Sequence, residues 1–234
     1  MDFLDEIDVG CTFFVVPNKL KDEKFISELK RAAAKGHELA LHGVDHFKNE
    51  FGVLYPIPLS LLPIPTFKKQ KQRLEKGVKT MVEITGIKPV GFRAPYLLYS
   101  NATLRALSSL GFRYDSSLSL FKPSHSSRFR IGWSQKIKPF FSNGILEICV
   151  SGDYTFKLSS NNFHHILGKA INDFKQIASH EGVFVLNNHP KRFSQVESLS
   201  LKFSKKKFRR TLISTDFAML PRCFRVKVNN SLHF

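Results

Sequence analysis

Strand-like and helix-like segments alternate along most of this 234-residue chain. The strand-like segments are short and rich in β-branched and aromatic residues, whereas the helix-like segments carry apolar residues at helical spacing. Such alternation is typical of an α/β protein with a mainly parallel sheet. We expect strands near residues 11–16, 38–42, 90–93, 112–115, 145–150 and 183–186, and helices at 22–35, 67–85, 101–110 and 162–180.

Turn-forming residues mark the ends of the expected helices. Asn101 is suited to cap the helix that begins there, and glycines at positions 36, 86 and 111 follow three of the helices. Residues 53–65 are rich in proline, and residues 118–143 have the composition of a long loop with an irregular strand or two. The length suits one sizeable domain, so we expect a domain over residues 1–200 and a basic C-terminal segment over 201–234.

The balance of charge is the unusual feature of the composition. The chain has 36 Lys and Arg against 19 Asp and Glu, a formal net charge of +17. The cluster Lys202-Phe-Ser-Lys-Lys-Lys-Phe-Arg-Arg210 interleaves basic and aromatic residues, which suggests binding to nucleic acid or another anionic polymer. Basic residues are nevertheless spread over most segments, and the chain has no nucleic-acid-binding motif. This distribution favours a solvated face, or a segment attracted to anionic polysaccharide or lipid.

Cysteine usage and the chain start predict a cytoplasmic location. The three cysteines, Cys11, Cys149 and Cys223, are widely spaced and form no Cys-x-x-Cys pair, which is typical of buried thiols in a reducing compartment. The first eight residues carry four acids, whereas a secretory signal would begin with basic residues and an apolar run. No stretch is apolar and long enough for a transmembrane helix. We therefore expect neither a signal peptide nor a membrane span.

Two histidines follow the second expected strand. His42 and His46 lie four residues apart in Leu-His-Gly-Val-Asp-His-Phe. If the turn after the strand is helical, both imidazoles can face one metal ion. Two unrelated histidines, one capping and one solvated, fit the same spacing equally well.

Polar residues also follow three other expected strands. Arg93 and Tyr96 lie in Arg-Ala-Pro-Tyr, where the proline fixes a turn and leaves the Tyr96 amide free to meet a ligand oxygen. Asp115 lies in Tyr-Asp-Ser-Ser and could pair with Arg93, and His189 lies in Asn-His-Pro. In β/α barrels the active site collects at the carboxyl ends of the strands. We therefore expect these side chains and the two histidines to converge on one cleft.

Together, these motifs resemble the polysaccharide deacetylase family, the NodB-homology carbohydrate esterases, over roughly residues 1–193. The family's Gly-His-Glu-Ile-x-x-His-(Ser/Thr)-x-x-His motif is matched from Gly36 to His46, except that Gly43 replaces the hydroxyl residue. The other matching segments are Phe3-Leu-Asp-Glu-Ile-Asp-Val-Gly-Cys-Thr-Phe-Phe-Val-Val16, Arg93-Ala-Pro-Tyr96, Tyr114-Asp-Ser-Ser117, Leu146-Glu-Ile-Cys-Val150 and Val183-Phe-Val-Leu-Asn-Asn-His189.

The resemblance implies a distorted (β/α)7-type barrel that removes acetyl groups from N-acetylated oligo- or polysaccharides. Such an enzyme is a hydrolase of non-peptide carbon–nitrogen bonds and uses Zn²⁺ or another divalent metal. By this resemblance His42 and His46 would be metal ligands, and His189 would be the general acid that protonates the leaving amine. The Tyr96 amide would hold the oxyanion, and Arg93 and Asp115 would orient the catalytic groups.

The chain departs from the family at its start. Members have a first strand ending in Thr-Phe-Asp-Asp, which supplies the general base and the third metal ligand, and this chain lacks that motif. By the same resemblance, Asp2, Asp5 and Asp8 would belong to the helix that follows, and Asp45 occupies another position of the histidine motif. We expect a truncated barrel without its first strand, which would bind zinc weakly and have impaired activity. A catalytically inactive carbohydrate-binding relative is the alternative.

Overall fold

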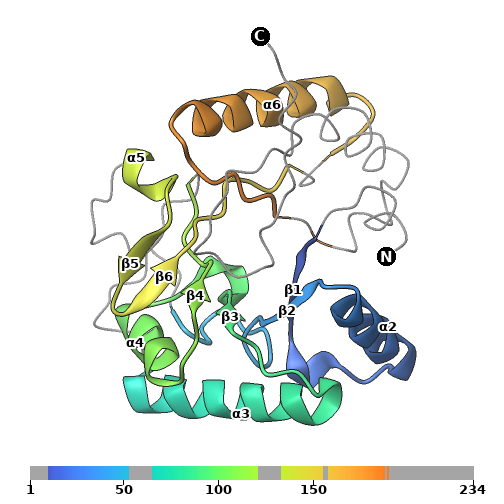
Figure 1. Ribbon diagram of the computed structural model, residues 1–234, viewed down its shortest axis with the longest axis vertical. Coiled ribbons are helices and arrows are strands. Elements are labelled where there is room, and N and C mark those ends of the chain that lie inside the picture. Colours follow the sequence, from blue (N-terminus) through green and yellow to red (C-terminus); the bar gives the residue numbers. More distant parts are fainter. Residues whose placement is uncertain (1–9, 53–64, 121–132, 155–157, 188, 190–234) are drawn as a thin grey trace.

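The computed structural model describes residues 10–52, 65–120, 133–154, 158–187 and 189. These residues form one six-stranded sheet with helices around it (Figure 1). The strands are β1 (Thr12–Val15), β2 (Glu38–Leu41), β3 (Gly91–Phe92), β4 (Tyr114–Asp115), β5 (Phe140–Ser142) and β6 (Ile145–Glu147). The helices are α2 (Glu23–Ala34), α3 (Phe67–Thr85), α4 (Asn101–Ser109), α5 (Trp133–Lys136) and α6 (Phe163–Ser179), with short 3-10 turns η1 (Pro17–Lys19) and η2 (Pro95–Leu97).

The sheet is mainly parallel, as the alternating pattern predicts. Its order is β1-β2-β3-β4-β6-β5, with all neighbours parallel except β5, which pairs antiparallel with β6. The α/β fold class is therefore confirmed. Within the described residues the sheet is open rather than closed into a barrel, with β1 and β5 at its two edges.

The expected strand at 183–186 is not formed in the structure. Leu186 makes an isolated parallel bridge with Gly152, and the Val185 carbonyl accepts from the Ser151 N–H at 2.9 Å. A second isolated bridge joins Ser119 to Val150. Pairing thus continues past the ends of β4 and β6, although too few consecutive residues pair to make a strand there.

The helices end close to the expected residues, but one cap differs. Asp22 caps α2 by accepting from the backbone N–H groups of the next turn, and Gly86 ends α3 in left-handed backbone. Asn101, expected to cap α4, is its first residue instead. The cap is Ser100, whose side chain and that of Thr103 each accept a backbone N–H in a capping box.

The main core lies between the sheet and the helices α3 and α4. Leu41, Phe92, Leu74, Met81 and Leu107 are fully buried there. In Figure 1, α3 lies at one end of the molecule and α6 at the other, with the sheet between them. None of the described helices is long and apolar enough to cross a membrane.

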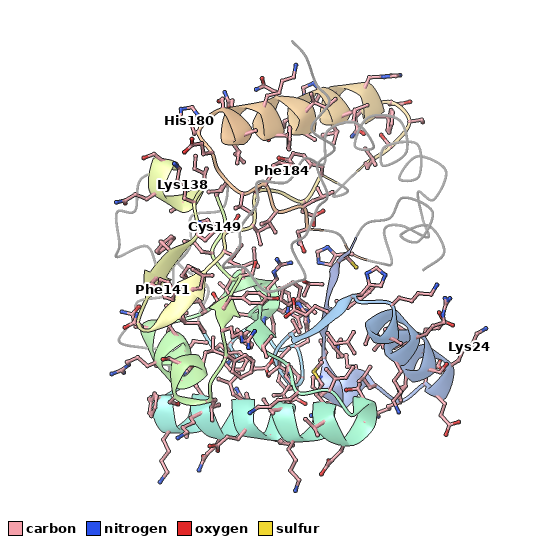
Figure 2. The ribbon with its side chains drawn as sticks, viewed as in Figure 1. Lys24, Lys138, Phe141, Cys149, His180 and Phe184 are labelled. Carbon is pink, nitrogen blue, oxygen red and sulfur yellow. The ribbon has the colours of Figure 1, made fainter. Side chains whose placement is uncertain are left out.

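A second, smaller cluster packs beneath α6. Phe184 lies under this helix (Figure 2) and contacts Tyr154, whose ring centroid is 6.0 Å away, and Phe174 at 5.6 Å. Cys11 and Cys149 are free thiols. The basic segment 201–234, the insertion at 53–64, Cys223 and the acids Asp2, Asp5 and Asp8 lie outside the described residues.

Candidate active site

His42 directly follows β2 and is held by two contacts to neighbouring strands. Its backbone N–H donates to the Val15 carbonyl at 2.7 Å, and its ring Nδ1 lies 2.8 Å from the Arg93 carbonyl oxygen. A carbonyl oxygen only accepts, so Nδ1 carries the hydrogen and the lone pair of Nε2 is left for another partner. Histidines that bind a metal are commonly oriented in this way by a backbone carbonyl.

His46 faces His42 without a helical turn between them. The two ring centroids are 4.9 Å apart, although residues 42–47 contain no helix. Left-handed backbone at Gly43, with φ 69°, and at His46, with φ 66°, bends this segment instead. The helical turn on which the sequence argument depended is therefore not formed, yet the imidazoles are neighbours.

Both imidazoles are in the form that binds metal. Burial lowers the pKa of His42 to about 4. The pKa of His46 is also lowered, first by burial and then by the charge of Lys19. Neutral imidazoles near pH 7 fit a divalent metal such as Zn²⁺. In the part of the chain that the structure describes, no group of three or more His, Cys, Asp or Glu residues could hold a metal ion, so the donors offered there are these two rings.

Arg93 is buried, and its guanidinium is held by uncharged groups. Nε donates to the Ser116 carbonyl at 3.0 Å, Nη2 to the Ser116 hydroxyl at 2.7 Å, and Nη1 to Asn187 Oδ1 at 2.8 Å. The guanidinium carbon lies 4.0 Å from the centroid of the Phe14 ring. Burial lowers the pKa of Arg93 to about 10, so it remains charged at neutral pH. The suggested hydrogen-bonded ion pair with Asp115 is not formed, and the hydrogen bonds of the guanidinium go to Ser116 and Asn187 instead.

Asp115 instead supports the loop after β3. Its two oxygens accept from the hydroxyl of Ser117 at 2.6 Å and from the N–H of Ser117 at 2.9 Å. The same hydroxyl oxygen accepts from the Ala94 N–H at 2.7 Å. Two residues on, Tyr96 has left-handed backbone, with φ 57°, and its ring centroid is 4.9 Å from that of His46. Among the described residues none accepts from the Tyr96 N–H, which leaves this donor for another partner.

His189 contacts an acid that the sequence did not single out. Its Nδ1 lies 3.1 Å from Asp153 Oδ2, and half of its side chain is exposed. Its positive charge, when present, helps to lower the pKa of both His42 and His46, so it lies within electrostatic reach of them. Asp153 follows the strand-like segment 145–150. Its place after a strand was therefore a signal that could have identified it.

A second buried carboxyl group lies beside Asp115. Glu147 is the partner of Asp115 in the register of β4 and β6, and both oxygens of its side chain are buried without a hydrogen-bond donor among the described residues. Burial and the charge of Asp115 raise the pKa of Glu147 far above its usual range. Burial also raises the pKa of Asp115. Glu147 therefore carries a proton at neutral pH.

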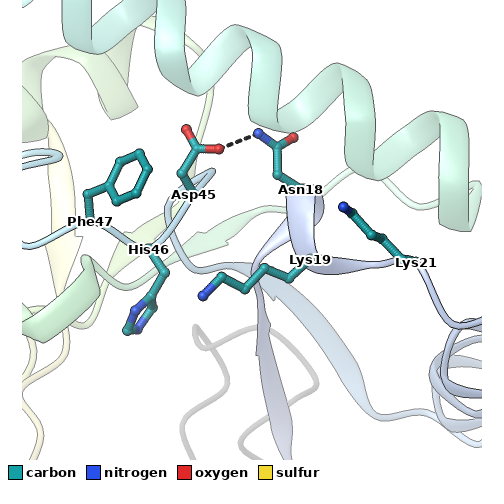
Figure 3. A pocket seen from close by; sticks show the side chains of 6 residues that line it. All are labelled: Asn18, Lys19, Lys21, Asp45, His46 and Phe47. Atoms are coloured by element: carbon teal, nitrogen blue, oxygen red, sulfur yellow. Dashed lines mark hydrogen bonds between the residues drawn. The ribbon is translucent and has the colours of Figure 1, made fainter.

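An open pocket of about 540 Å³ adjoins His46. In Figure 3, Lys19 extends toward His46, while Asp45 faces Asn18, whose side-chain amide donates to it. Phe47 also lines this pocket and is 59% exposed. An exposed aromatic ring beside an open pocket is suited to pack against a sugar ring.

Comparisons with known proteins find polysaccharide deacetylases. A family model described as polysaccharide deacetylase matches residues 1–114. A peptidoglycan deacetylase of Helicobacter pylori is 32% identical over 96 residues, which are 41% of this chain and 28% of that protein. A peptidoglycan deacetylase-like protein of Gibberella zeae is 31% identical over 121 residues, 51% of this chain and 31% of that protein. The match thus spans less than a third of either relative.

A solved structure has the same fold. The crystal structure of a Mycobacterium smegmatis protein, described as a polysaccharide deacetylase, superposes with a TM-score of 0.62 at 21% identity. The superposition covers 86% of this chain and 66% of that one. At this identity the likeness concerns the fold alone. In this chain, His42 and His46 follow β2, and Arg93 and Tyr96 follow β3.

Proposed function

Because the chain belongs to the polysaccharide deacetylase family, we propose that it carries a centre for the metal-dependent removal of N-acetyl groups from amino-sugar polymers. The observation that supports this most directly is the pair of neutral imidazoles, His42 and His46, with ring centroids 4.9 Å apart. The exposed ring of Tyr96 and the pocket beside His46 leave room for a carbohydrate at this pair.

In this proposal His42, through Nε2, and His46 hold a divalent metal. Bound there, the metal would polarise the acetamide carbonyl and acidify a water molecule. The protein's own part is to keep both rings neutral by burial and to orient His42 through the Arg93 carbonyl. Arg93 itself ties this loop to Ser116 and Asn187, so its role is to position rather than to react.

The Tyr96 N–H and His189 have the two remaining roles. The Tyr96 amide donates to the oxygen that becomes negative when the acetamide carbon is attacked, a contribution of about 3 kcal/mol for one good donor. His189 protonates the leaving amine, and Asp153 orients its ring through Nδ1. Asp115 acts at a distance, because it holds Ser117 and thereby the Ala94 backbone.

The general base and a third metal ligand have no assigned residue. The described residues supply two imidazoles, and a zinc site with two protein ligands binds more weakly than one with three. Impaired turnover by this chain therefore stays a prediction. A carbohydrate-binding relative without catalysis is the alternative, which the exposed Phe47 beside the pocket also fits.

Zinc binding and acetate release test the proposal on the full chain. Zinc titration by calorimetry should show a site that is lost in His42→Ala and kept in His165→Ala, an exposed histidine on α6 that serves as the matched control. Acetate release from N-acetylglucosamine oligomers should require the metal and fall in His189→Gln and Asp153→Asn. Zinc binding that survives His42→Ala would refute the metal centre, whereas zinc and oligomer binding without acetate release would favour the inactive relative.

A further inference from the structure

Glu50 holds the segment that carries His46. Its side chain is buried, with 1% of the residue exposed, and its two carboxylate oxygens accept from four consecutive backbone N–H groups. Oε1 accepts from Val44 at 2.6 Å and Asp45 at 3.3 Å, and Oε2 accepts from His46 at 2.9 Å and Phe47 at 3.2 Å. These four N–H groups lie outside any helix or strand, and one side chain accepts from all of them.

This contact offsets a strained backbone. His46 has a left-handed backbone, with φ 66°, a conformation that is unfavourable for a residue with a Cβ. Hydrogen bonds to an ionised carboxylate are about twice as strong as those between neutral groups. The Glu50 carboxylate therefore stabilises the backbone conformation that turns the His46 ring toward His42.

The surroundings hold Glu50 itself in place. Its backbone carbonyl accepts from Arg73 Nη1 on α3 at 2.8 Å, and the next residue, Phe51, is fully buried in the core. Gly43 packs against the same carboxylate, because a Cβ there would lie 2.8 Å from Glu50 Oε2 and 2.6 Å from Pro95 Cγ. The turn after β2 is therefore built around this buried carboxylate.

Glu50 is not placed to bind the metal directly. Each of its oxygens already accepts two hydrogen bonds, which occupy the lone pairs that a metal would need. Its influence on a metal must pass through the backbone that positions the His46 ring.

We propose that Glu50 is a positioning residue that pre-forms the His42–His46 metal site and thereby sets its zinc affinity. This inference rests on the proposed metal centre and identifies how the protein maintains it. Residues that orient metal ligands typically change metal affinity by about 10- to 100-fold when they are replaced.

The decisive variant is Glu50→Gln. It keeps the size of the side chain, but its NH2 group faces two backbone N–H donors where an oxygen accepted them. Zinc titration of the full chain should show an affinity about 10- to 100-fold lower than that of the unsubstituted protein. The d–d absorption of bound Co²⁺ should also change, because it reports the geometry of the ligands. Glu28→Gln is the matched control, since Glu28 is a half-exposed helix residue paired with Arg31.

Two further variants separate positioning from other effects. Glu50→Asp keeps the charge but shortens the side chain, so it should also weaken zinc binding; zinc binding as tight as in the unsubstituted protein would show that charge alone matters and would overturn the inference. Tyr114→Phe removes a buried hydrogen bond to Glu38 Oε2, 2.8 Å long, and should lower the melting temperature without changing zinc affinity or the Co²⁺ spectrum. If it changes both, a general loss of stability explains the effect and positioning by Glu50 is refuted.

The outcomes also separate this inference from the function on which it rests. If the unsubstituted chain binds no zinc at His42, the proposed metal centre fails and the inference falls with it. If it binds zinc at His42 and Glu50→Gln binds with the same affinity and the same Co²⁺ spectrum, the metal centre stands and the role of Glu50 is refuted.

Discussion

The buried carboxyl group of Glu147 predicts a stability that falls as pH rises. In the unfolded chain this group loses its proton above its ordinary pKa of 4.5, whereas in the folded protein burial and Asp115 keep it protonated to much higher pH. Between these two values the folded state binds one more proton than the unfolded state. Each pH unit in this window therefore removes up to about 1.4 kcal/mol of folding free energy.

Replacing Glu147 with Gln removes this pH dependence. The amide has nearly the same shape, carries no charge, and can donate to the neighbouring Asp115 carboxylate. The oxygens of Glu147 accept no hydrogen bond from the described residues, so little is lost. The difference in unfolding free energy, variant minus unsubstituted protein, should rise by up to about 2.7 kcal/mol between pH 6 and pH 8.

Urea denaturation followed by far-ultraviolet circular dichroism measures this difference at pH 5, 6, 7 and 8. Groups that do not interact with Glu147, such as His42, contribute equally in both proteins, so their contributions cancel in the difference. Asp115 interacts with Glu147, so the difference reports the titration of this pair. Near pH 5 the two proteins should have similar stability, and at pH 8 Glu147→Gln should be the more stable. A difference that stays constant from pH 5 to pH 8 would refute the reasoning, because it would mean that folding does not change the protonation of Glu147.

Four further substitutions should change stability. Gly91→Ala should destabilise the fold by about 2–3 kcal/mol in urea denaturation, because its Cβ would overlap the Tyr114 ring; Gly168→Ala, on α6 with open space around it, should instead stabilise by up to about 1 kcal/mol. Ser117→Ala should cost about 1–3 kcal/mol, since it leaves the buried Asp115 Oδ1 and the Ala94 N–H without a partner, and an unchanged urea midpoint would contradict this. Asp22→Ala removes the cap of α2 and should cost about 1 kcal/mol, which differential scanning calorimetry would detect as a lower melting temperature.

Local patterns along the chain predicted most of the described elements. The helix at 67–85 begins and ends at the expected residues, because its amphipathic spacing and the following Gly86 are both local signals. The prediction that Asn101 caps its helix was wrong. Ser100 and Thr103 form a reciprocal capping box, so the cap lies one residue earlier, at Ser100. The antiparallel strand β5 lies in a stretch without clear periodicity, and its pairing with β6 stabilises it.

Local patterns also predicted part of the candidate site. Strand-end positions and motif spacing identified His42, His46, Arg93 and Tyr96, and the structure brings them together around two neighbouring loops. The distant partner of Arg93 was not predictable from spacing. It is Asn187, 94 positions away along the chain, and which polar group meets a buried guanidinium depends on how distant segments pack.

The sequence by itself determined where strands and helices form and which chemical groups follow each strand. These properties depend on backbone propensity and on residues a few positions apart. Only the tertiary structure decided that Glu50 binds the backbone around His46, that Asp115 supports Ser117 rather than pairing with Arg93, and that Glu147 is buried without a donor. Burial and hydrogen-bond partners arise when separate segments come together, and they set the pKa and the orientation of each side chain.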